Sequence, residues 1–170
     1  MIPAIVMLLV YLVFMVSIQS YAAPEKKIFG QVSMAFAVIS KMLLVADYFI
    51  QFSVVPVSLM NGELEGIPLI IQYNSHGPFI VVEELGYLLM SLSFFFAAFV
   101  FDPKSRLEAA IRWIFIAGFV LTMLAFGFVT ADLGLERRDR FEVIVISITW
   151  LVLIVNGILA GILFKKRMRD

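Results

Sequence analysis

The chain has no cysteine and only one histidine among its 170 residues. Disulfides, thiolate metal sites and thiol nucleophiles are therefore excluded, and so are metal motifs built on paired histidines. The sequence also has no glycine-rich phosphate loop and no G-x-S-x-G turn, so it gives no basis for nucleotide binding or serine hydrolysis. We expect no cofactor and no resident metal ion.

Charged residues are scarce, at 15% of the chain, and the 13 basic and 13 acidic side chains cancel. A nucleic-acid partner is not expected, because it would require an excess of positive charge. Basic residues are missing altogether between Met42 and Pro103, where six acidic residues give a net charge of −6. The charge is therefore distributed very unevenly along the chain.

Apolar side chains are abundant, at 62% of the chain, and include 17 phenylalanines. A soluble fold of this size could not hide so much apolar surface, whereas a helix of about 20 apolar residues spans the hydrocarbon core of a bilayer. We predict five membrane spans, at residues 2–22, 28–55, 78–101, 111–130 and 141–164. The sequence thus predicts a single-domain, all-α, polytopic integral membrane helix bundle whose surroundings are the lipid bilayer.

Prolines and charged residues predict where these helices begin and end. Pro56 is expected to end the second span, because proline removes a helix hydrogen bond. Pro78 is expected to begin the third span, at the first helical position. The fourth helix is expected to open at Ser105, because Ser105 and Glu108 have the spacing of a capping box.

Lysine and arginine in the connecting segments predict the orientation, because cytoplasmic loops retain these residues. With the N-terminus outside, nine Lys and Arg residues lie inside and three, Arg137, Arg138 and Arg140, lie outside. We therefore predict an N-out/C-in topology. Residues 61–77, between the second and third spans, are apolar in the middle and are expected to lie in the outer interface or to re-enter the membrane.

The second span carries a stripe of polar residues on one helical face. Ser33, Ser40 and Asp47 are seven residues apart, and Gln51 follows Asp47 by four. Because polar groups at this depth are costly, the stripe is expected to face the bundle interior. Asp47 is then the titratable group of a proton or cation site, or else it forms a structural hydrogen bond to a neighbouring helix.

Two adjacent acids, Glu83 and Glu84, open the third span and share its polar side with Tyr87. With Asp47 and Gln51 they are expected to line an outward-facing cavity. The alternative is that the two glutamates only stabilise the start of the helix through its dipole. His76, the chain's one histidine, is expected to be a loop residue, although it could also contribute to a ligand site here.

The last span contains Asn156 deep in the membrane and a G-x-x-x-G spacing at Gly157 and Gly161. Small residues allow close helix contact, and an asparagine can hydrogen-bond across it. We favour packing within the chain, while a homo-oligomer or a partner membrane subunit stays open.

Three functions are compatible with this pattern. The leading interpretation is a protein that binds a small ligand or cation in the pocket between spans two and three, with proton-coupled transport as its extension. The second is a membrane enzyme acting on a lipid or apolar substrate, with Glu83 or Glu84 as general base and His76 as acid or metal ligand. The third is a non-catalytic accessory subunit of a membrane complex.

Overall fold

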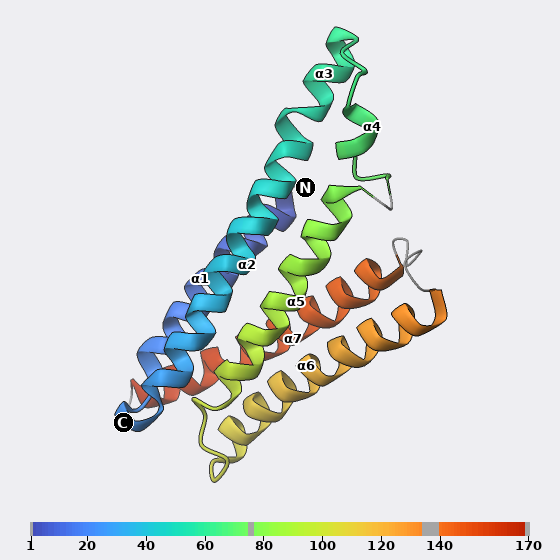
Figure 1. The fold of residues 1–170 in the computed structure, drawn as a ribbon. Helices are drawn as coiled ribbons and strands as arrows, with labels where there is room; N and C mark the ends of the chain where they lie inside the picture. The colour runs from blue at the N-terminus through green and yellow to red at the C-terminus, as the bar shows by residue number, and fades with distance from the viewer. Residues whose placement is uncertain (1, 75–76, 134–139, 169–170) are drawn as a thin grey trace.

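In the computed structural model, the structure describes residues 2–74, 77–133 and 140–168, and this part of the chain is helical with no strands. The elements in chain order are α1 (Ile2–Tyr21), the 3-10 turn η1 (Pro24–Lys26), α2 (Lys27–Ser53), α3 (Val55–Asn61), α4 (Ile67–Ile70), α5 (Pro78–Ala98), α6 (Arg106–Leu133) and α7 (Arg140–Arg167), as drawn in Figure 1.

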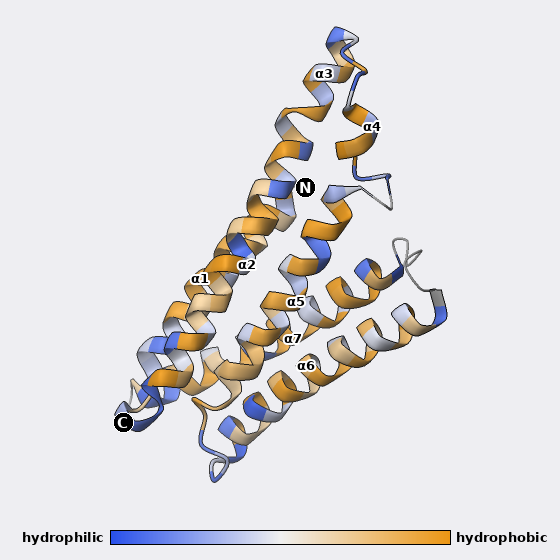
Figure 2. Cartoon of the chain, in the orientation of Figure 1, coloured by the Kyte–Doolittle hydropathy of each residue, from blue (hydrophilic) through white to orange (hydrophobic). Residues whose placement is uncertain are grey.

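Five of the described helices are long and apolar enough to cross a membrane. They are α1, the nearly continuous α2 and α3, α5, α6 and α7. The prediction of an all-helical chain with five helices of membrane-spanning length and hydropathy is therefore confirmed for the described residues. Figure 2 shows apolar residues along the lengths of these helices and polar residues mainly at their ends and in the connections, with further polar bands inside α2 and in the first half of α5.

The helical region that follows η1 extends beyond its predicted end. Val54 keeps a helical conformation, and the bonds from Val54 N–H to Ile50 O (2.9 Å) and from Ser58 N–H to Val54 O (3.0 Å) continue the helical pattern on both sides of the expected stop. Pro56 lies in the first turn of α3, where a missing N–H is tolerated. The chain leaves the helix only at Gly62, whose φ of 73° is the left-handed conformation that glycine adopts readily.

The start of α6 also differs from the expected capping box. The Glu108 carboxylate accepts hydrogen bonds from the backbone N–H of Asp102 (2.7 Å) and from the Tyr21 hydroxyl (3.0 Å). It therefore fastens the turn before α6 to the end of α1.

Helix α5 lies at the centre of the bundle, against α2, α6, α7 and α1. More than half of its apolar stretch is buried, against a third or less in every other spanning helix. Its most extensive contact is with α2, which runs antiparallel to it (Figure 1). Toward its C-terminal end an aromatic core holds three helices together, with Phe94 stacked on Phe115 at 5.1 Å between ring centroids and Tyr11 edge-on to Phe94 at 5.7 Å.

Candidate functional site

The polar stripe of α2 faces α5, and its four members are buried: Ser33, Ser40, Asp47 and Gln51. The Ser33 hydroxyl donates to Ser93 O (2.8 Å), and the Ser93 hydroxyl donates back to Ser33 O (2.9 Å). Two turns further along α2, the Ser40 hydroxyl donates to Gly86 O (2.7 Å). These bonds satisfy the hydroxyls without water and fix the register of α2 against α5.

The same contact depends on a glycine. A methyl group added at Gly86 would lie 2.6 Å from Leu44 Cγ and Cδ2, far inside ordinary carbon contact. Gly86 therefore allows α2 and α5 to approach closely enough for the Ser40 hydroxyl to reach the α5 backbone.

Beyond this contact, toward the start of α5, four side chains form a hydrogen-bonded chain across three helices. Trp150 Nε1 of α7 donates to the Tyr87 hydroxyl (3.3 Å), which lies 3.0 Å from the Tyr48 hydroxyl of α2. Tyr48 in turn donates to Oε1 of Glu83. Because Tyr48 uses its proton on Glu83, Tyr87 must be the donor in the contact between the two hydroxyls. The chain therefore runs in one direction, from the indole to the carboxylate.

Two carboxyl groups at this end have an oxygen that is buried and without a hydrogen-bond partner: Oε2 of Glu83 and Oδ2 of Asp47. Glu83 is 3% exposed and Asp47 is 8% exposed. A third acid, Glu142 in the first turn of α7, lies within electrostatic range of Asp47 and of Tyr87. Buried, incompletely paired carboxylates are costly when charged, so a bound proton or another positive group at this end of the bundle would be stabilising.

The other predicted site residues have different roles. Gln51 donates through Nε2 to Ile70 O and accepts from the Gln72 backbone N–H (3.1 Å), so it fastens the connection after α3 to α2. At 1.5 Å per residue, the four-residue α4 in that connection is only about 6 Å long. Glu84 is buried next to Glu83, and His76 lies outside the described residues.

The described residues contain no group of three or more His, Asp or Glu side chains placed to hold a metal ion.

In α7, Asn156 is fully buried and donates through Nδ2 to Ile111 O of α6 (3.3 Å). Gly157 and Gly161 behave differently, because a methyl group at either position would meet no atom within 4 Å. The two glycines therefore do not mediate the close contact within the chain that we favoured from the sequence, and packing against another chain stays an open alternative. The close glycine of this helix pair is Gly118 of α6, where an added methyl would lie 2.5 Å from Val152 Cγ2.

Sequence reasoning missed Tyr48, Trp150 and Gly86. Tyr48 could have been found, because it lies four residues after the buried Leu44 and three before Gln51, on the same helical face. Trp150 and Gly86 carry no comparable sequence pattern, since their roles depend on helices that are distant in the chain.

Comparison of the chain with known protein families, with curated proteins and with solved structures finds no match.

Proposed function

We propose that this protein is a multi-pass membrane protein that binds a proton, the smallest cation, at the carboxyl groups of Asp47 and Glu83. The observation that carries the proposal is the hydrogen-bonded chain of Trp150, Tyr87 and Tyr48, which ends on a buried Glu83 whose second oxygen has no partner. A proton on that oxygen, or on the free oxygen of Asp47, would remove a buried charge at no steric cost.

The chain of hydroxyls is suited to holding a proton and not to conducting one. An indole N–H only donates, so Trp150 cannot accept a proton and pass it further into the bundle. Proton uptake and release would therefore occur at the Glu83 end. Coupling to transport of a second solute would need α2 and α5 to move relative to each other, or a second subunit, since five spans without an inverted repeat make a poor solitary transporter.

The topology that fits this function is N-out/C-in, which places the acids at the outer end of the bundle. The start of α5, the end of α2 and the start of α7 lie at one end, while the basic residues at the start of α2 and the end of α7 lie at the other (Figure 1). The absence of cysteine makes a clean test possible. In intact cells, a membrane-impermeant maleimide should label Glu63→Cys but not Lys104→Cys. The reverse labelling would show that the orientation is N-in/C-out instead.

Infrared difference spectroscopy across pH tests the proton site directly. The purified protein in phosphatidylcholine bilayers should show the C=O stretch of protonated carboxyl groups that lose their proton as pH rises. Asp47→Asn and Glu83→Gln should each remove one such band. Tyr48→Phe should shift the Glu83 band without removing it, because it deletes the hydrogen bond and keeps the carboxyl group.

Glu63→Gln is the matched control, because Glu63 is an exposed carboxylate in the connection after α3. A spectrum in which neither Asp47→Asn nor Glu83→Gln removes a titrating band would refute the proposal.

An accessory subunit is the second candidate function. It is favoured by Lys41 of α2, a charged residue in the lining of an otherwise apolar groove between α1 and α2. The enzymatic alternative depends on His76, which lies outside the described residues.

A further inference from the structure

Lys41 lies in the middle of α2, on a face that the polar site does not use. It is 14 residues from Lys27 and 12 from Ser53, the ends of the helix, or about 21 and 18 Å along the axis at 1.5 Å per residue. Lys41 is half-buried. Neither a hydrogen bond nor an ion pair involves its ammonium group anywhere in residues 2–74, 77–133 or 140–168.

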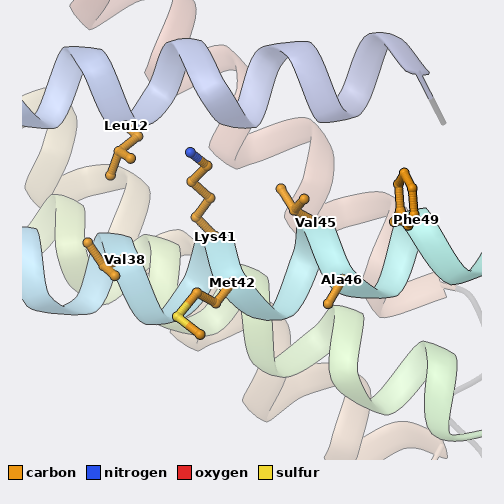
Figure 3. Close-up of a pocket in the computed structure, with 7 residues that line it drawn as sticks. All are labelled: Leu12, Val38, Lys41, Met42, Val45, Ala46 and Phe49. Atoms are coloured by element: carbon orange, nitrogen blue, oxygen red, sulfur yellow. The ribbon is translucent and has the colours of Figure 1, made fainter.

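The ammonium lies in an apolar groove of about 480 Å³ between α1 and α2. Figure 3 shows the Lys41 side chain extending across this groove toward α1. The apolar residues of the lining are Leu12 from α1 and, from α2, Val38, Met42, Val45, Ala46 and Phe49. Lys41 is the one charged residue among them.

The spacing of the α2 residues is that of a helix-packing stripe. Positions 38, 41, 42, 45, 46 and 49 recur every three or four residues and so lie on one face. Met42 and Phe49 are 68% and 58% exposed, so no helix of the described chain covers this face. Ala46 leaves room at the centre of the stripe for a second helix to approach.

A charged group at mid-span is expensive and is normally paired. The pairing group must carry a negative charge and lie at the same depth. Lipid phosphates lie at the membrane surface, too far from mid-span for the lysine stem. A second copy of this chain offers no such group either, because the acids in its described spanning helices are buried at the polar site or lie at helix ends. A carboxylate on a helix of another protein meets both conditions.

We propose that the groove between α1 and α2 binds a transmembrane helix of a different membrane protein, and that an aspartate or glutamate near the middle of that helix pairs with Lys41. This site is independent of the proton site, because it lies on another face of α2 and shares no residue with it.

A synthetic polyleucine transmembrane peptide with one central aspartate is the probe. The protein, labelled at Glu63→Cys, and the labelled peptide are reconstituted in phosphatidylcholine vesicles, and their association is measured by energy transfer. Matched peptides carry leucine at the centre, or the aspartate one turn from the end.

The central-aspartate peptide should associate about 3- to 30-fold more tightly than the leucine peptide. This is the ratio of affinities that corresponds to the measured strength of single polar contacts between membrane helices. Lys41→Met should abolish that preference, and Lys41→Glu should transfer it to a peptide with a central lysine. Thermal unfolding of each variant checks the fold. If both variants misfold, the comparison of peptides on the unsubstituted protein decides alone.

Equal association of the aspartate and leucine peptides would overturn the proposal, as would a preference that survives Lys41→Met. A lipid occupant would also overturn it. In that case phosphatidylglycerol or oleate, added to the vesicles without peptide, would raise the melting temperature only while Lys41 is present.

Discussion

The contact between α2 and α5 should fail on the addition of a single methyl group. In Gly86→Ala the new Cβ would lie 2.6 Å from two atoms of Leu44, whereas carbon atoms pack at about 3.5–4.0 Å. The helices would have to separate by about 1 Å at this point. The hydrogen bond from the Ser40 hydroxyl to Gly86 O, now 2.7 Å, would then exceed hydrogen-bonding distance.

Overpacking of this kind costs about 1–3 kcal/mol, and the lost hydrogen bond adds about 0.6 kcal/mol by the average for membrane helices. The free energy of unfolding in mixed detergent and SDS micelles should therefore fall by about 1.5–3.5 kcal/mol. Gly157→Ala is the matched control, because its Cβ would meet no atom within 4 Å and alanine has the better helix propensity.

The cause can be isolated by a double-mutant cycle. Leu44→Ala removes the atoms that the new methyl would strike. In that background the free energy of unfolding should therefore fall by at least about 1 kcal/mol less on Gly86→Ala, because residues in contact have non-additive effects of this size. The reasoning is refuted if Gly86→Ala is as stable as the unsubstituted protein, or if its cost is the same with and without Leu44.

The other interhelical contacts give smaller effects in the same unfolding assay. Ser33→Ala and Ser93→Ala should each cost about 0.6 kcal/mol, since each removes one hydroxyl that donates to the opposite backbone. Asn156→Leu should cost no more than about 2 kcal/mol, because a single Nδ2 bond to α6 is lost, and an unchanged value would mean that this bond contributes nothing. Tyr48→Phe should cost about 1–3 kcal/mol by leaving the buried Glu83 carboxyl without its donor. Tyr73→Phe, at an 82% exposed side chain, should be neutral.

Hydropathy was sufficient to predict the five long helices, because the need to satisfy every backbone group in lipid leaves few other solutions. The spacing of Ser33, Ser40 and Asp47 was sufficient to predict one polar face. The buried acids of the third span were sufficient to suggest that this face turns toward it, and the extensive contact between α2 and α5 agrees with that expectation. The individual partners were not predictable, because the positions of Trp150 and Gly86 depend on helices that are distant in the chain.

Two local predictions failed for physical reasons. Pro56 removes only one donor, and a proline in the first turn of a helix loses little, so the helical segment extends to Gly62. Glu108 had the spacing of a capping residue, but the nearby Tyr21 hydroxyl and Asp102 N–H are its partners instead. The Pro56 prediction failed because of its position in a helical turn, whereas the Glu108 pattern was outweighed by neighbours that come close only in the folded chain.

The polar groups of α2 divide into two sets according to where their partners lie. Ser33, Ser40 and Tyr48 find acceptors on α5, so the chain itself supplies what these hydroxyls need. Lys41 has no acceptor among the described residues, although it directly follows Ser40 in the sequence. A helix that served only to hold the bundle together would gain nothing from a lysine about 100° away from its packing face. An unpaired cation at that position stabilises the protein only when another molecule brings the opposite charge, and this is why we assign the α5-facing side of α2 to chemistry within the chain and the α1-facing side to recognition.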